Sequence, residues 1–229
     1  MKYLDLVLGL EYHNEMIVPS KKLTEPDAVT KGPRARTRRL MVMTASQMMQ
    51  RGGSPSVSEV AEVAEVSRST AYRYFPTQSA MVQAVVVEAL GPILSWEPSK
   101  TDPEELIASL FESSFPRILA NEAIFRAALR QSLEAGGDAL QDGEDGSFGR
   151  GHRVDLLMRA LSGLADVLSD AQRTRLAQAL SLAFGIESAV VLKDIWGLNN
   201  GGVQSVTLWA ARAMIRAALA EISENDVVR

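Results

Sequence analysis

The residues best suited to chemistry lie between Ser56 and Thr77, where basic, hydroxyl and aromatic side chains alternate over a short stretch. Arginine can bond guanine edges through two N–H groups, serine and threonine can bond bases or phosphates, and tyrosine hydroxyls can reach phosphate oxygens. This stretch carries such side chains at Arg68, Ser69, Thr70, Tyr72, Arg73 and Tyr74. The set is suited to binding a nucleic acid.

Two short helices joined by a tight turn must position these side chains. Ser56 lies three residues before Glu59, so its hydroxyl can cap a helix while the carboxylate bonds back to the cap. Ser67 can cap a second helix, which Pro76 stops because its ring cannot continue the hydrogen-bond ladder. Few apolar residues anchor this second helix, Ala71 among them, so most of its surface stays available.

The positive charge of the chain is concentrated near this helical pair. Five Lys and Arg lie in the nine positions from Lys31 to Arg39, with no acid among them. From Thr30 to Pro76, eight Lys and Arg face three Glu, a net charge of +5, so the remainder carries −9 within an overall −4. Such a patch binds phosphate by charge alone, and more weakly as salt rises. We expect Arg34, Arg36 and Arg38 to contact DNA, although such a run on its own could be only a solvated arm.

This part of the chain resembles the TetR family of bacterial transcriptional regulators. The resemblance covers about Arg38 to Leu90 and rests on the Arg-rich start, on Gln50-Arg51-Gly52, on Val57 to Ser67 and on Ser69 to Pro76. It implies an all-α protein. Its parts would be a three-helix helix-turn-helix DNA-binding domain at 31–78 and a helical ligand-binding and dimerisation domain at 79–229.

The resemblance also implies which residues contact DNA. By position, Arg68, Ser69 and Thr70 lie where such proteins approach bases. Tyr72 and Tyr74 lie where they touch the DNA backbone. The remaining DNA-binding residues expected on the two helices are Ser58 and Arg73.

Two positions depart from the family pattern. The turn often contains glycine, but this chain has Glu65, which must either extend the helix or adopt a left-handed turn conformation. The next helix often begins with a Lys-Glu pair, whereas Gln78 and Ser79 stand there. A cationic phosphate contact is therefore missing at this position, and the arginines upstream are expected to carry more of the binding.

Downstream, the pattern predicts helices throughout. A helix is expected to end at Gly91-Pro92, a later one to kink or end at Pro116, and others to span about 154–168 and 170–196. Gly201-Gly202 is expected to turn the chain into the last helix. Side-chain caps are expected at Thr77, Asp102, Asn121 and Ser169.

Two stretches have no regular pattern. Residues 1–30 form an extension of unknown role: a short helix packed on the body or on DNA, a mobile tail, and a start codon set too far upstream all stay open. Gly136 to Gly151 holds six glycines and four acids in sixteen residues. Its spacing matches neither a nucleotide loop nor a calcium loop, so we expect a flexible interhelical connection.

The last two helices are apolar over more than one face, which requires more than one neighbour. In proteins of the resembling family they form a four-helix bundle between two subunits, so we expect a homodimer; completing a monomer core is the alternative. The residues expected at the dimer interface are Ile186, Val190, Trp209, Ala213 and Ile215.

The family further implies a small-molecule pocket in the helical domain. Its candidates are mostly apolar, so an apolar or aromatic ligand is expected, although residues of these types belong more often to a core than to a pocket. The candidate ligand-binding residues are Trp96, Phe111, Phe115, Phe125, Leu129, Met158 and Phe184.

Residue usage argues against other classes of function. There is no cysteine, and the two histidines, His13 and His152, lie in no metal-ligand or catalytic spacing. We therefore expect no catalytic residue, no metal and no cofactor. Two other classes of protein stay open beside a DNA-binding regulator. The main one is an enzyme, and the other is a helical protein that has lost its DNA target. No apolar run approaches the ~20 residues of a membrane span, and a cytoplasmic protein is expected.

The function expected from the sequence is that of a transcriptional regulator. It would be a repressor that binds an inverted-repeat operator as a homodimer and is released by a small molecule. Two copies of the reading helix can address half-sites about 34 Å apart on one face of double-stranded DNA.

Overall fold

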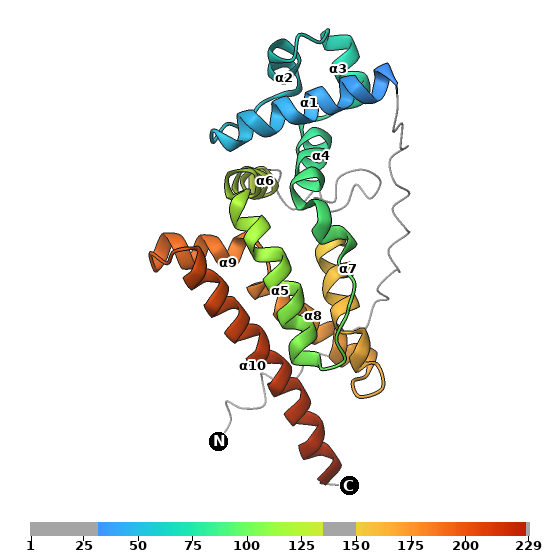
Figure 1. The fold of residues 1–229 in the computed structure, drawn as a ribbon, viewed down its shortest axis with the longest axis vertical. Helices are drawn as coiled ribbons and strands as arrows, with labels where there is room; N and C mark the ends of the chain where they lie inside the picture. Colours follow the sequence, from blue (N-terminus) through green and yellow to red (C-terminus); the bar gives the residue numbers. More distant parts are fainter. Residues whose placement is uncertain (1–31, 135–149, 228–229) are drawn as a thin grey trace, which may run out of the picture. The chain divides into compact units, whose positions relative to one another are not determined.

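The computed structural model describes residues 32–134 and 150–227, and within these ranges it contains helices and no strand. Figure 1 shows α1, α2 and α3 gathered together, with α4 leading from them into the remaining helices. The helices are α1 (Pro33–Gln50), α2 (Val57–Val63), α3 (Arg68–Tyr74), α4 (Gln78–Leu90), α5 (Pro103–Ala120), α6 (Glu122–Glu134), α7 (Arg150–Ala160), α8 (Asp170–Ala183), α9 (Ile186–Val190) and α10 (Asn200–Val227). Shorter turns are η1 (Gly91–Ser95), η3 (Ser162–Leu164) and the π-helical η4 (Val191–Ile195). The predicted all-α fold is confirmed. We call α1–α3 the reading unit and residues 78–227 the body.

Hydroxyl caps start the two short helices of the reading unit, as predicted. Ser56 Oγ accepts from the N–H of Glu59 at 3.2 Å, and Glu59 Oε2 accepts from the N–H of Ser56 at 2.7 Å. The backbone hydrogen bond from Ser56 is the main cause that lowers the pKa of Glu59. Ser67 Oγ accepts from the N–H of Thr70 at 3.3 Å. These caps satisfy N–H groups that a first helical turn leaves without partners.

Glu65 adopts the left-handed conformation, which was one of the two alternatives for the turn between α2 and α3. Its φ is 54°, a region that a side chain other than glycine rarely occupies. The turn is closed by the N–H of Val66, which donates to the carbonyl of Ala61 at 2.8 Å. The chain can therefore leave α2 and enter α3 without a glycine.

An apolar core beneath α3 leaves the outer face of that helix free. Ala71 is fully buried and Phe75 is 2% exposed. They belong to a cluster with Met41, Val42, Ala45, Met49, Val57, Val60, Ala61 and Ala64 of α1 and α2. Burying these side chains fixes how α3 stands on the other two helices.

In the body, α5 packs against α10, α7 and α4. Phe111 and Phe115 on its inner face meet Phe184, which follows α8, with ring centroids 5.0 to 6.1 Å apart. All three rings are buried, so this aromatic cluster lies in the core of the body.

Pro116 does not end α5, which continues to Ala120, so that alternative of the prediction is wrong, while a kink at Pro116 stays a prediction. A proline inside a helix leaves the carbonyl four residues earlier without its donor. That carbonyl belongs to Glu112, and both Glu112 and Pro116 are exposed, so water can replace the donor. Buried Phe115 and Ile118 hold the following turn in place. Tertiary packing thus outweighs the local cost of proline.

The single helix predicted over 170–196 is broken at Gly185. This glycine has φ 140° and separates α8 from α9. Ser188 Oγ donates to the carbonyls of Ala183 at 3.0 Å and Gly185 at 2.9 Å, which satisfies acceptors exposed by the break. The apolar periodicity of the two segments is continuous, so it did not reveal the interruption.

Three smaller expectations also differ from the structure. Nδ2 of Asn121 donates to the carbonyl of Arg117 at 2.9 Å, so this side chain closes α5 rather than capping α6. The helix expected over 154–168 ends at Ala160. Gly201 and Gly202 lie inside the first turn of α10 rather than before it. The caps at Thr77, Asp102 and Ser169 are confirmed.

Two described stretches, Gln78–Ser95 and Asp170–Ile195, are long and apolar enough to cross a membrane by length and composition alone. The sequence expectation of no such run is therefore wrong on length. Both stretches are interrupted, at Gly91 and at Gly185, by a positive φ. They also supply core side chains such as Met81, Leu180 and Phe184, as central helices of a bundle do.

The described helices belong to one compact unit, Lys31–Arg229. The boundary expected between residues 78 and 79 therefore stays a prediction. The extension at 1–30 and residues 136–149 of the glycine-rich connection expected at 136–151 lie outside the described residues. Arg150 and Gly151, which were expected in that connection, already belong to α7.

Candidate nucleic-acid interface and ligand cavity

The outer face of α3 presents the side chains that the sequence singled out. Arg68, Ser69, Tyr72 and Arg73 are exposed, and Tyr72 keeps 46% of its surface accessible. Thr70 and Tyr74 on the same helix are half-buried. The structure thus brings these six residues together on one short helix, with four of them exposed and with Tyr74 packed against the apolar core.

Hydroxyl contacts restrain part of this face. Ser67 Oγ donates to Thr70 Oγ1 at 2.9 Å and lies 3.2 Å from Ser69 Oγ. The hydroxyls of Ser58 and Tyr72 lie 3.2 Å apart, which links α2 to α3 across the turn. Ser58 therefore positions the tyrosine as well as lying beside the outer face itself.

Two aromatic contacts orient arginines of the reading unit. The guanidinium carbon of Arg38 lies 5.4 Å from the ring centroid of Phe75, and that of Arg73 lies 5.6 Å from the ring of Tyr74. Such contacts restrict a guanidinium without neutralising it. Arg38 thereby joins the start of α1 to the end of α3.

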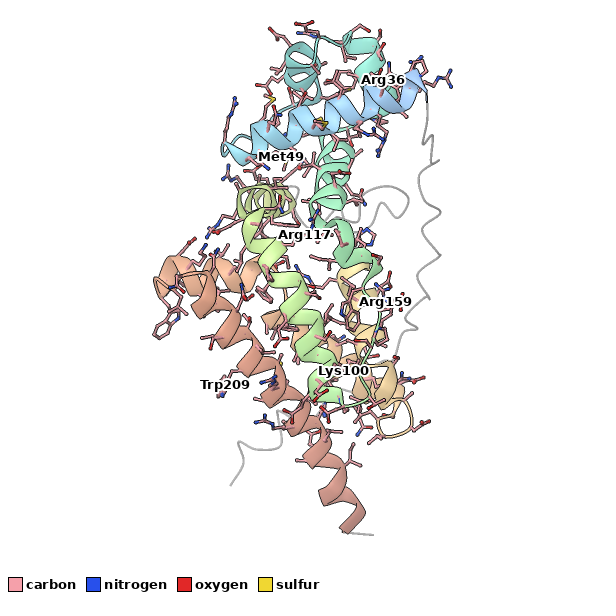
Figure 2. All side chains as sticks on the ribbon, viewed as in Figure 1. Arg36, Met49, Lys100, Arg117, Arg159 and Trp209 are labelled. Atoms are coloured by element: carbon pink, nitrogen blue, oxygen red, sulfur yellow. The ribbon has the colours of Figure 1, made fainter. Side chains whose placement is uncertain are left out.

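The arginines of α1 extend the same cationic surface. Arg34, Arg36, Arg38 and Arg39 are all exposed, and Figure 2 shows Arg36 at the free end of α1. In residues 32–96 as described, none of the seven arginines forms an ion pair. Their charge is therefore available to an external anion.

Gln78 braces the loop before α2 and does not point away from the protein. Its Nε2 donates to the carbonyls of Ser54 at 3.1 Å and Pro55 at 3.0 Å. The amide thus holds the entrance of α2 against the start of α4. This role explains how a neutral side chain can stand where the family pattern has a cation.

A cavity of about 370 Å³ lies in the body between α4, α6 and α7 and the break that separates α8 from α9. Its walls are mainly apolar. Arg153 and Glu187 form a charged pair in its lining, with Nη2 of Arg153 donating to the two Glu187 oxygens at 2.9 and 2.8 Å. The apolar lining is formed by Val86, Leu90, Ile93, Ile118, Phe125, Ala128, Leu129, Val154, Leu156, Phe184 and Ile186. A cavity of this size and lining suits a small molecule.

The residues expected to bind a ligand are divided among different places. Phe125, Leu129 and Phe184 line this cavity. Met158 lines a second, more open hollow of about 590 Å³ beside α7, which also includes His152 and Arg159. Phe111 and Phe115 are buried in the aromatic cluster, and Trp96, half-buried after η1, lines neither space. The ligand assignment stays a prediction.

The charged lining of the cavity was missed by the sequence reasoning. Arg153 and Glu187 lie 34 positions apart on α7 and α9. No spacing rule connects such a pair before the helices are placed. Gln83, Ser132 and Ser181 also line the cavity, and nothing in the sequence distinguishes them from ordinary surface residues.

The residues expected at a dimer interface differ in burial. Ile186 and Ile215 are buried within this chain, and Val190 is half-buried. Trp209 is 72% exposed and Ala213 is also exposed; Figure 2 shows Trp209 on the outer side of α10. Other exposed apolar side chains of this region are Val191, Ile195, Trp196 and Val206. The interface stays a prediction.

An ion-pair network ties η4 to α6. Arg126 donates to the two Asp194 oxygens, each at 2.7 Å, and to Glu122 Oε1 at 2.8 Å, while Lys193 donates to Glu122 Oε2. Burial of the Glu122 carboxyl raises its pKa, but the hydrogen bonds from Lys193 and Arg126 outweigh burial and lower it overall. The hydrogen bond from Arg126 likewise lowers the pKa of Asp194. Within the described ranges, no group of three or more His, Cys, Asp or Glu could hold a metal ion.

Comparison with known proteins bears on the fold. No protein-family model and no curated protein matches the chain. Among solved structures, a TetR transcriptional regulator from Rhodococcus sp. RHA1 is 18% identical, with a TM-score of 0.57 over 80% of this chain and 97% of that one. A TetR-family transcriptional regulator from Streptomyces coelicolor is 19% identical, with a TM-score of 0.62 over 82% of this chain and 84% of that one. The chain therefore has the fold of TetR-family transcriptional regulators.

Proposed function

We propose that this protein is a cytoplasmic, DNA-binding transcriptional regulator, and more specifically a repressor that binds an inverted-repeat operator as a homodimer and is released by a small molecule. The observation that carries the proposal is the outer face of α3, where exposed Arg68 and Arg73 have no ion-pair partner among residues 32–134 and 150–227. Unpaired cations on a short, well-anchored helix suit phosphate and base-edge contacts in a major groove.

The reading unit provides two kinds of contact. Arg68, Ser69 and Thr70 at the start of α3 would approach base edges, because a recognition helix reads bases with its first residues. Arg34 and Arg36 on α1, with the tyrosine hydroxyls of α3, would contact phosphates, which fixes register without reading sequence.

Dimerisation would supply the second half-site contact. Trp196, which follows η4, and Trp209 on α10 are large apolar side chains exposed to solvent. Exposing them does not stabilise a monomer, whereas burying them against a partner would stabilise a dimer. A second copy that covers them would place two α3 helices on one duplex. Operator half-sites about 34 Å apart would then match the protein's two-fold symmetry.

Release from DNA by the ligand would act through α4, because this helix contacts both the cavity and the reading unit. Gln83, Val86 and Leu90 of α4 line the cavity, and α4 also packs against α1 of the reading unit. Arg117 of α5 holds the end of α4, with Nε donating to the carbonyl of Ala89 at 2.6 Å (Figure 2). A ligand that prefers an altered position of α4 would change the spacing of the two α3 helices, with a coupling of about 1–3 kcal/mol.

A gel-shift of the purified full chain tests the DNA-binding part directly. The duplex would be the DNA immediately upstream of the protein's own gene, compared with a random duplex of equal length at the same salt. Preferential retardation of the upstream DNA is expected. If no duplex is retarded even at low ionic strength, the proposal is wrong.

A further inference from the structure

The charged pair in the lining of the cavity is built into the break between α8 and α9. Gly185 in that break has φ 140°, and a Cβ placed there would lie 2.6 Å from Nη2 of Arg153 and 2.7 Å from Oε2 of Glu187. The guanidinium and the carboxylate therefore meet directly over the glycine. A side chain at this position would displace the two charged ends and would also be strained by the positive φ.

Arg153 has donor capacity left over, whereas Glu187 does not need further donors. A guanidinium carries five N–H groups, and Arg153 uses Nη2 alone toward Glu187. Its Nε and Nη1 have no hydrogen-bond partner among the described residues, whereas Arg126 and Arg216 engage their carboxylates through two nitrogens. Each oxygen of Glu187 already accepts from Arg153.

The remaining polar side chains of the lining can act as donors or acceptors. Gln83, Ser132 and His152, which also line the cavity, can each donate as well as accept a hydrogen bond, whereas Ser181 already donates to the carbonyl of Ala177 at 2.8 Å. The surplus of donors comes from Arg153, whose guanidinium has no acceptor. A ligand that only accepts hydrogen bonds would therefore find more unused partners here than one that only donates. A ligand ammonium would first have to displace Arg153 from Glu187.

The apolar walls require the rest of the ligand to be apolar. Leu90, Ile118, Phe125, Leu129 and Phe184 offer no hydrogen-bonding side chain, so a polar segment buried against them would lose its hydrogen bonds to water without replacement. A molecule that combines an apolar body with a single polar end would satisfy both parts of the lining.

We propose that the cavity binds an amphipathic carboxylate, with its apolar body between α4 and α6 and its carboxylate on the unused N–H groups of Arg153. The inference rests on the proposed function only in taking this cavity as the site of the regulating ligand. It replaces the expected apolar or aromatic compound by an anionic one. Glu187 holds the guanidinium in place in the absence of ligand and, by like-charge repulsion, limits the affinity for the bound carboxylate.

The test uses three probes that share one chain and differ in the charge of the head: octanoate, 1-octanol and octylamine. Their binding to the full chain is measured by isothermal titration calorimetry at neutral pH, without DNA. We expect octanoate to bind at least about ten-fold more tightly than octanol, which corresponds to 1.4 kcal/mol, and octylamine to bind more weakly than either.

Two lining variants and one control assign the effect to residues. Arg153→Gln should remove the advantage of octanoate over octanol while octanol binding persists, which also shows that the cavity is still formed. Glu187→Gln should increase octanoate affinity, because it removes the competing carboxylate. Arg216→Gln, on α10 outside the cavity lining, should leave all three affinities unchanged.

The outcomes separate this inference from the proposed function. Equal binding of octanoate and octanol, preference for octylamine, an unchanged octanoate advantage in Arg153→Gln, or no binding of any probe would each overturn the carboxylate assignment. A gel-shift of the same preparation without probe reports on DNA binding independently. A negative probe titration therefore does not contradict DNA binding, and a negative gel-shift does not contradict carboxylate binding.

Discussion

The reading unit and the body use their arginines in opposite ways. In the described part of the body, all nine ion pairs lie between residues 97 and 221. Six of them join segments that are distant in sequence, as Arg216 joins α10 to Glu104 of α5. In the reading unit, the arginines face solvent, and Arg38 and Arg73 are oriented by aromatic rings instead of carboxylates.

The different pairing of the arginines indicates that the body is built for a stable fold and the reading unit for binding an external anion. Carboxylates that neutralise guanidinium groups within the body help to hold its helices in one arrangement. Like charges left together on the reading unit repel one another and disfavour the folded state. An external polyanion removes that repulsion when it binds. Substitutions in the body should therefore affect stability first, and substitutions in the reading unit should affect DNA binding first.

The largest effect is expected from Phe111→Ala in the aromatic cluster of the body. Deleting a buried phenyl ring removes its apolar contacts and leaves a cavity, which typically costs about 3–5 kcal/mol. Urea unfolding followed by circular dichroism measures the change. Leu133→Ala is the matched control, because Leu133 is 74% exposed on α6. A loss below about 1 kcal/mol in Phe111→Ala would show that the cluster is not packed as described.

Arg68→Ala should lower the discrimination between operator and random DNA by about 10- to 100-fold, because one base-reading contact is worth about 1–3 kcal/mol. Its stability should change by no more than about 0.5 kcal/mol, as for other exposed positions. Fluorescence anisotropy titrations of both duplexes at one salt concentration measure the ratio. Equal losses on both duplexes would remove the base-reading role from Arg68.

Arg36→Ala should weaken binding to operator and random DNA about equally and reduce the salt slope of log K by about 1, since one phosphate contact is lost. The slope is measured over a series of salt concentrations. Arg175→Ala is the control from the body, where Arg175 is likewise exposed but pairs with Glu221. A change of slope in the control equal to that in Arg36→Ala would contradict the assignment of the two regions.

The smallest effect is expected from Arg126→Gln and depends on pH. Glu122 and Asp194 have pKa values lowered in the folded protein, so the folded state binds their protons less readily than the unfolded state. The stability that they contribute is present above the unfolded pKa values of about 4 and is lost as pH falls below them. The melting temperature of the variant should lie a few degrees below that of the original at pH 7 and approach it toward pH 3. A difference that grows in acid would have the wrong sign.

Local signals predicted the reading unit in detail. The caps at Ser56 and Ser67 depend on groups within a few positions of one another, so short-range spacing contains the information. For Glu65 the sequence left two conformations open, and the structure has the left-handed one. The same spacing identified Arg68 to Tyr74 as the outer face of α3, because few of those positions carry an apolar side chain.

The body was predicted only in outline, because its details depend on contacts between distant segments. Pro116 was expected to disturb α5, and only the packing of Phe115 and Ile118 explains why the helix continues. Phe111, Phe125 and Phe184 looked alike as candidates, yet Phe111 lies wholly in the core, Phe125 lines the cavity, and Phe184 does both. Residue type cannot distinguish these two fates, since both surroundings are apolar.

By itself the sequence determined the all-helical composition, the caps and turn of the reading unit, and the surplus of positive charge at its arginines. These properties follow from residue types and from neighbours within about one helical turn. Only the tertiary structure decided which apolar side chains surround a cavity, that Arg153 meets Glu187 over Gly185, and that the ion pairs of residues 32–134 and 150–227 are confined to the body. Each of these depends on where separate helices come together, which no local spacing specifies.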